Sequence, residues 1–376
     1  MTTILGRIGT DLKLQRIILI ISAFLAAISL AQGCRNAYLV SQDFQWDAAK
    51  ALSLKINPYD ESINPSGALE PYGFEEYYLQ MEANQFPSLL LLLFPYTLLP
   101  PLAARYAWLL SNLFFTAGIV FLLRKTFLRA ETGIGNFEFI FSMLITIAGT
   151  PYRNQLGVGQ HTLFAFFFFL SAVYCIEKKS ESSSLKIQSG SVYKTTDTSL
   201  IPGEKLNIGA SLALFVCYFK YTLTVPLVLY FVYKKRYKEI LLSVFLHIIL
   251  TAYCADLLND SFINMIIKPL KVSSRLSAEG GLDFGALLNG SFVSYILSFI
   301  TMAGLLAFTL HAMRRSFPEN VIIHIDSAVI SVLILWSMIL TYHRTYDFFV
   351  IITVLSFMHV PKCPAYIRIL YSAALI

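Results

Sequence analysis

The sequence has little charge for its length. Only 14% of its 376 residues are charged, whereas 56% are hydrophobic, and the mean hydropathy is +0.63. An ordinary soluble domain has about 25% charged residues, so the composition excludes that class and predicts an all-α polytopic membrane protein. The net charge of +6 does not predict nucleic-acid binding, because the basic residues lie in short blocks beside apolar runs, where they orient helices in the bilayer.

Metal and nucleotide motifs are also missing from the sequence. The five cysteines are odd in number and lack the paired spacing of a metal site. No Walker or dinucleotide-binding loop occurs. Asp43 and Asp47 can hold a divalent ion beside a phosphate, but nothing else in the sequence indicates one, so no cofactor is predicted. An internal repeat is not evident either, which disfavours a transporter built from two related halves.

Long apolar segments are what the sequence does contain. With the positive-inside rule they predict about eleven crossings and a cytoplasmic N-terminus. The expected crossings are 17–33, 106–123, 137–150, 162–176, 206–219, 222–233, 240–258, 291–310, 327–341, 348–360 and 365–376. Several are shorter than the roughly 20 residues that a lone helix needs, which indicates helices that stop within a cavity.

The remaining segments are expected to be loops of one integral domain, residues 1–376. Residues 35–104 form the first external loop, in which prolines divide the apolar stretch 86–104 into juxtamembrane or re-entrant helices. Residues 177–205, rich in Ser and Thr, are predicted to be a mobile cytoplasmic loop. Residues 259–290 are predicted to be a second large external loop.

Two carboxylates stand out in the first external loop. Asp43 and Asp47 are four residues apart, so one helix would place both on the same face. Adjacent like charges raise the pKa of a carboxyl group and help it to act as a general base. A solvated amphipathic interface helix is the alternative interpretation of the same spacing.

Basic and polar side chains gather at two further external positions. Arg153, Gln160 and His161 bracket a Gly-Val-Gly sequence, whose backbone amides can face an anion while Arg153 contacts a phosphate; a plain helix connector is the alternative. Lys220 lies inside an apolar segment, where a charge costs about 2.5–3.5 kcal/mol. It either meets a lipid-linked phosphate between two half-helices or reaches along a turn to the surface.

The last polar cluster follows a late apolar segment. It runs from Tyr342 through His343 and Arg344 to Asp347 and supplies an imidazole, a permanent cation and a carboxylate within one turn. An interfacial anchor is the alternative. With the predicted threading, all of these clusters fall on the external side, which predicts one site at that surface.

In order and topology the chain resembles glycosyltransferase family 87, membrane enzymes of the GT-C fold that use polyprenyl-phosphate sugars. The resemblance runs over most of the chain and depends on individually loose motifs, which are Asp43-Phe44, Ala48-Ala49, Asn57-Pro58-Tyr59, Phe86-Pro87, Leu99-Pro100, Gly159-Gln160, Asn207-Ile208-Gly209, Lys220 and Pro226. Two positions depart from the family pattern. Trp46-Asp47 replaces an aromatic pair, and Gln85-Phe86-Pro87 replaces Tyr-Pro-Pro.

The resemblance implies a GT-C-like bundle that transfers a hexose such as mannose to a hydroxyl of an external glycan or glycolipid. It makes Asp43 the catalytic base and places His343 near the reacting centre. Lys220, with Arg153 or Arg344, is expected to bind the donor phosphate.

Further residues are expected to contact substrate: Asp47, Gln160, His161, Tyr342 and Asp347. The expected location is the plasma (inner) membrane, with the active site on the external or periplasmic face. Two other classes stay open, a lipid-linked oligosaccharide flippase and a glycan polymerase or ligase.

Overall fold

The protein was analysed as a computed structural model. It describes residues 11–39, 41, 44–68, 71, 82–126, 136–188, 205–278, 322–340 and 343–354, with short stretches between 293 and 311. Across these ranges all regular structure is helical. Several of the helices are long and apolar, so the chain is a helical, multi-pass membrane protein.

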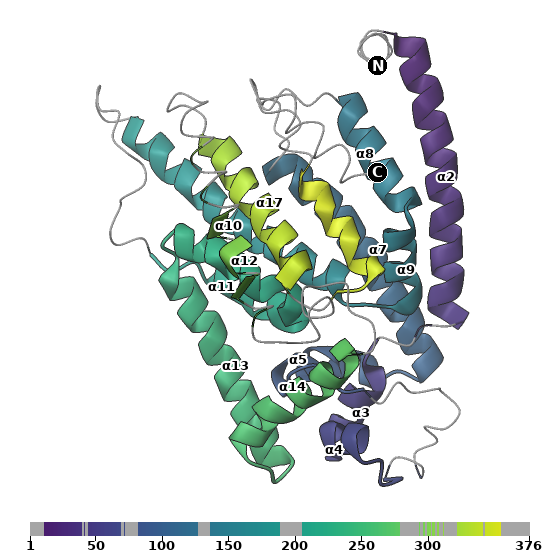
Figure 1. Ribbon diagram of the computed structural model, residues 1–376, viewed down its shortest axis with the longest axis vertical. Coiled ribbons are helices and arrows are strands. Elements are labelled where there is room, and N and C mark those ends of the chain that lie inside the picture. The colour runs from purple at the N-terminus through teal and green to yellow at the C-terminus, as the bar shows by residue number, and fades with distance from the viewer. Residues whose placement is uncertain are drawn as a thin grey trace.

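Three single helices have the length and composition of membrane spans. They are α2 (Leu12–Leu39), α7 (Pro101–Thr126) and α13 (Tyr237–Leu257). Each exposes large apolar side chains, such as Phe24 at 67%, Phe114 at 64% and Leu241 at 68%, as expected for surfaces that face lipid. In Figure 1, α2 runs along one side of the bundle.

A fourth segment, Ile208–Tyr233, is long enough to count as one span, but its contacts show that it folds back. It comprises α11 (Ile208–Cys217), the 3₁₀ turn η5 (Tyr218–Lys220) and α12 (Tyr221–Tyr233). A straight helix of this length would be about 39 Å long. The Asn207 amide before α11 nevertheless donates to Glu239 Oε1 after α12, at 3.0 Å, and the six residues from Tyr233 to Glu239 reach at most about 20 Å. The segment is therefore a hairpin with Lys220 at its tip, as the sequence predicts.

A bent pair of helices adds a further candidate span. Here α9 (Thr150–Val158) and α10 (Thr162–Gln188) meet at 106°, after α8 (Asn136–Ala148). Because α10 continues to Gln188, the prediction that a mobile loop begins at 177 is wrong for its first part. By length and composition alone, the described part of the chain has four span-like helical segments, one of which is the Ile208–Tyr233 hairpin, or five with the bent pair. The count of about eleven stays a prediction, because much of 291–310 and all of 355–376 lie outside the described residues.

Short helices gather at one end of the bundle (Figure 1). They are α3 (Trp46–Ser53), α4 (Pro58–Ile63), α5 (Pro87–Leu90), η3 (Leu91–Leu93) and α6 (Phe94–Thr97). Prolines at the first turns of α4, α5 and α6 supply the fixed φ that favours a helix start. The predicted loop 259–290 contributes a long helix to this end, α14 (Phe262–Ala278). Lys268 of α14 pairs with Asp60 at 2.7 Å and Asp260 at 2.6 Å and so ties α14 to α4.

An aromatic core next to these short helices fixes the position of the α9–α10 corner along α7. Trp108 of α7 stacks on Phe44 at 4.8 Å between ring centroids, contacts His161 at 5.3 Å, and donates from Nε1 to Gly159 O at 2.8 Å. From Trp108 to the basic end of α7 at Lys125 is about 25 Å of helix. The corner between α9 and α10 is thus almost a full hydrocarbon thickness, about 30 Å, from that basic end.

Two late elements complete the described fold. They are α17 (Ile322–Leu340) and the 3₁₀ helix η6 (Thr345–Val354). α17 packs against α12 and η6 packs against α9, so the connection between α17 and η6 lies close to the hairpin tip and the α9–α10 corner.

Candidate functional site

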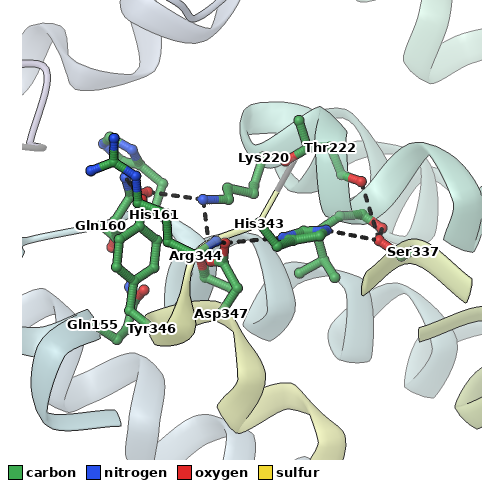
Figure 2. Close-up of polar contacts among 12 residues, drawn as sticks. Gln155, Gln160, His161, Lys220, Thr222, Ser337, His343, Arg344, Tyr346 and Asp347 are labelled. Carbon is green, nitrogen blue, oxygen red and sulfur yellow. Dashed lines mark hydrogen bonds and ion pairs between the residues drawn. The ribbon is translucent and has the colours of Figure 1, made fainter. Parts of the chain in front are cut away.

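Three distant segments bring polar side chains together inside the bundle (Figure 2). The α9–α10 corner supplies Gln160 and Thr162, the hairpin tip supplies Lys220, and the α17–η6 connection supplies His343 and Asp347. We call these five residues the polar cluster. Its members are separated by up to 187 positions in the sequence, so the cluster exists only in the folded chain.

The corner exists because of how α9 ends. Gly159 caps the helix with a φ of 75°, a left-handed conformation that glycine adopts without strain. A Cβ at this position would also lie 2.4 Å from Ser41 Oγ. The chain can therefore turn sharply at Gly159 and direct Gln160 and Thr162 toward the hairpin tip.

Asp347 is the hub of the polar cluster. Its Oδ1 accepts from Lys220 Nζ at 3.2 Å and from the Thr162 hydroxyl, and its Oδ2 contacts His343 Nδ1 at 3.0 Å and accepts from the Arg344 amide at 3.4 Å. Burial by itself raises the pKa of Asp347, but Lys220, His343 and Thr162 outweigh it and hold this pKa below its ordinary value. Asp347 is therefore a buried carboxylate anion.

Lys220 is the least buried of the three ionisable members of the polar cluster. Its side chain is 9% exposed, against 1% for Asp347 and 0% for His343. Two of its three N–H groups are used by Gln160 Oε1 at 3.0 Å and Asp347, and the ammonium lies 5.3 Å from the centroid of the Tyr346 ring.

Amides and hydroxyls fix the groups around Lys220. Gln160 Nε2 donates to the Tyr346 hydroxyl at 2.9 Å, which leaves Gln160 Oε1 directed at Lys220. On the other side of the cluster, Ser337 of α17 contacts His343 Nε2 at 3.3 Å. Thr162 and Ser337 are site residues that sequence reasoning missed, because their types are common on apolar helices and no local signal marks them. Tyr346 lies within the predicted cluster of residues 342–347 but was not itself predicted to be a site residue.

His161 does not join the polar cluster, although the sequence predicted a substrate contact. It is buried between aromatic rings, with Phe219 at 4.3 Å and Trp108 at 5.3 Å between centroids. Its Nε2 lies 3.0 Å from Phe44 O, so it donates to that carbonyl. The contact attaches the segment at Phe44 to the α9–α10 corner, which is a structural role for His161.

Arg153 is likewise placed elsewhere than predicted. It donates to Gln32 of α2 at 3.0 Å and to Thr150 at 3.4 Å, and so faces α2 and not Lys220. The predicted anion-binding turn is also wrong, because Gly157 lies inside α9, where a Cβ would be 2.9 Å from Asn36. These glycines serve close helix packing and the helix cap.

The expectation of two carboxylates on one helical face is also wrong. The helix begins at Trp46, after Gln45 with a φ of 58°, so position 43 precedes it. Asp47 is buried in α3, and among the described residues its Oδ2 accepts no hydrogen bond. Burial raises the pKa of Asp47 to about 7, against a smaller opposing effect of its own helix N-terminus and Arg105.

Asp43 and Tyr342 lie outside the described residues, so their roles stay predictions. The described neighbours of Asp43 bind the α9–α10 corner. Ser41 Oγ donates to Val158 O at 3.2 Å, and Phe44 O accepts from His161.

Comparisons with known proteins do not identify a relative of this chain. No family model, curated protein or solved structure matches the chain. In the described part of the chain, no three His, Cys, Asp or Glu residues are grouped so that they could hold a metal ion. Function therefore has to be argued from the polar cluster itself.

Proposed function

We propose that the protein is a membrane glycosyltransferase of the GT-C type that transfers a hexose from a polyprenyl-phosphate sugar to a hydroxyl of a glycan or glycolipid. The observation that carries this proposal is a buried, hydrogen-bonded cation, Lys220, at the tip of an apolar hairpin. Placing a lysine there costs about 2.5–3.5 kcal/mol, and its exposed edge matches a phosphate group attached to a lipid chain.

The depth of the polar cluster supports a lipid-linked donor. The cluster lies about a hydrocarbon thickness from the basic end of α7, beside the short helices α3 to α6. A polyprenyl phosphate has its phosphate at such a boundary and its chain among the apolar helices. By the positive-inside rule, the basic end is cytoplasmic and the cluster belongs to the external face.

Two side chains, Asp43 and Lys220, catalyse the proposed reaction. The acceptor oxygen bonds to the anomeric carbon as the bond from that carbon to the phosphate oxygen breaks, and the electron pair leaves on the polyprenyl phosphate. Asp43 takes the proton of the acceptor hydroxyl, which is general-base catalysis. Lys220 stabilises the charge that develops on the leaving phosphate, a preorganised electrostatic contribution.

The support for Asp43 as the base comes from its described neighbours. Ser41 and Phe44 both bind the corner that carries Gln160, the hydrogen-bond partner of Lys220. Asp47 lies in the first turn of α3 and is the described carboxylate nearest to Asp43 in the sequence. It is a candidate for acceptor binding.

The proposal is tested by sugar transfer in proteoliposomes. Radiolabelled polyprenyl-phosphate mannose and glucose are each offered with membranes of the source cell as acceptor. Asp43→Asn should reduce transfer by about 10²–10⁴-fold, and Lys220→Met by about 10²-fold or more. Lys268→Met is the matched control, because it removes a lysine that pairs with two carboxylates away from the cluster. Wild-type transfer by a correctly inserted Asp43→Asn protein, or equal losses for the two lysine variants, would refute the proposal.

A flippase is the second candidate, because buried ionisable networks also line transport pathways. The described members of the polar cluster all come from a corner, a hairpin tip and a connection between helices, and this compact arrangement favours transfer. A fluorescent polyprenyl-phosphate sugar in the same vesicles separates the two. Movement of the probe between leaflets without sugar transfer would select the flippase.

A further inference from the structure

Helix α14 begins where the preceding span reaches the surface of the bilayer. The span α13, Tyr237–Leu257, is about 31 Å long, which matches the hydrocarbon thickness of about 30 Å. It starts beside the basic residues 234–236, so by the positive-inside rule its far end near Leu257 is external. In Figure 1, α14 turns back from that end toward the short helices. Because α14 packs against both α13 and α4, it lies along the external boundary of the bilayer.

One side of α14 carries apolar side chains that point away from the bundle. Ile263, Ile267 and Leu270 are spaced i, i+4 and i+7, so they form one row, which we call the outer stripe. Their exposed fractions are 64%, 41% and 43%. A different side of the same helix, with Met265 and Val272, is fully buried. The bundle therefore takes one apolar side of α14, and the outer stripe is a second.

The polar side of α14 lies next to the outer stripe. Asn264, Lys268 and Lys271 are also spaced i, i+4 and i+7 and form a row of their own. Lys268 pairs with Asp260 and with Asp60, which is 54% exposed, so this row faces water. Lys271 is exposed. A helix with water on one side and exposed apolar side chains beside it is suited to the interface between water and acyl chains.

The lipid-facing surface of α13 leads directly to α14. Phe245, Ile249 and Tyr253 are spaced four apart on α13 and are all exposed, so they form a row that reaches the external end of this span. The chain then enters α14 after a short turn at residues 258–261. The outer stripe thus continues a surface that is already in contact with lipid.

We propose that α14 is an interfacial helix whose outer stripe inserts among the lipids of the external leaflet, with Lys271 contacting anionic headgroups. The sequence of α14 contains no acidic residue, so this helix would not offer Lys271 a counter-ion from a second copy of the chain, whereas an anionic lipid does. The inference goes beyond the proposed function and does not depend on it.

The position of α14 in the lipid bears on the site because α14 also contacts the hairpin tip. The Tyr221 hydroxyl donates to Ser273 Oγ of α14 at 2.8 Å, and Tyr221 directly follows Lys220. An α14 held by lipid therefore supports the segment that carries the cation of the polar cluster.

Lipid contact is measured by photocrosslinking of the full chain in liposomes of phosphatidylcholine and phosphatidylglycerol. The photoreactive residue p-benzoylphenylalanine replaces Ile263, Ile267 or Leu270, one at a time, and mass spectrometry identifies the adducts. Each of these three variants should give lipid adducts. Replacement of Asn264, on the polar side, should give several-fold less, and replacement of Leu241, an exposed residue of α13, is the positive control for an inserted protein.

The headgroup contact is measured with the photoreactive residue kept at position 267. Adding Lys271→Gln should lower the share of phosphatidylglycerol in the adducts by about fivefold, since a basic residue near an anionic surface contributes about 1 kcal/mol. Lys235→Gln is the matched control, because Lys235 is exposed at the opposite, basic end of α13 and should leave this share unchanged.

Three results would overturn the inference. Adducts that join two chains at the outer stripe would identify a second copy as its partner. Absence of lipid adducts at all three positions, in samples where position 241 gives them, would show that the outer stripe faces water. An unchanged share of phosphatidylglycerol in Lys271→Gln would refute the headgroup contact. None of these results depends on sugar transfer, so the inference and the proposed function can fail separately.

Discussion

Removing the charge of Asp347 should destabilise the protein more than removing Lys220. Four donors converge on this carboxylate, from Lys220, His343, Thr162 and the Arg344 amide. Asp347→Asn keeps the shape but leaves the Lys220 ammonium facing a neutral amide, and breaking a buried pair in this way costs about 3–5 kcal/mol. Lys220→Met leaves the carboxylate with three donors and loses one charged hydrogen bond, about 1.5–3 kcal/mol.

The double variant Lys220→Met with Asp347→Asn measures the interaction energy between these two residues, apart from their contacts with other residues. Residues in one network do not contribute additively, so the double variant should be less destabilised than the sum of the single variants, by about 1–3 kcal/mol. The free energy of unfolding is measured by steric trapping in bicelles, with Ser331→Ala as the control for a buried polar loss on α17. A Lys220→Met protein as destabilised as Asp347→Asn, or strict additivity, would contradict the hub role of Asp347.

Two further predictions concern the end of the bundle where the short helices lie. Gly159→Ala should lower the free energy of unfolding by more than about 1 kcal/mol, because the new methyl group would meet Ser41 Oγ and because the residue has a φ of 75°. An unchanged melting temperature would show that the corner relaxes freely. For Asp47, the rise in pKa from 3.8 to about 7 means that the fold disfavours the ionised form, so stability is full near pH 4 and falls as pH rises to 7. Asp47→Asn should remove this slope, worth up to about 4 kcal/mol, and equal slopes in pH-dependent unfolding would refute the burial argument.

Much of the fold could be predicted because a bilayer requires long apolar segments with basic residues at their cytoplasmic ends. Apolar length and basic flanks identified the segments of α2, α7 and α13, and the charge of Lys220 marked the tip of the hairpin. Helix ends were less predictable. The helical part of 177–188 and the helix α14 are too polar for a hydropathy criterion to identify.

The site was predicted by residue type better than by geometry. Lys220, Gln160, His343 and Asp347 carry charge or amide groups in apolar surroundings, and the structure brings these four together. Arg153 was misplaced because sequence position does not tell which face of a nine-residue helix a side chain takes.

Residues with ordinary polar types were not predicted at all. Ser337 and Thr162 gain their importance from partners more than 100 positions away, and no periodicity encodes such contacts. Their roles follow only from the hydrogen-bond partners that the fold supplies.

The energetic balance of the polar cluster argues for function more strongly than its residue types do. A buried ion pair can usually be replaced by apolar side chains of similar volume at no cost in stability, and sometimes with a gain of about 1–4 kcal/mol. Here three separate segments supply the pair and its donors. A chain that needed only a stable bundle would gain nothing from this arrangement, whereas a chain that must hold an anionic leaving group beside lipid requires a fixed, partly accessible cation such as Lys220.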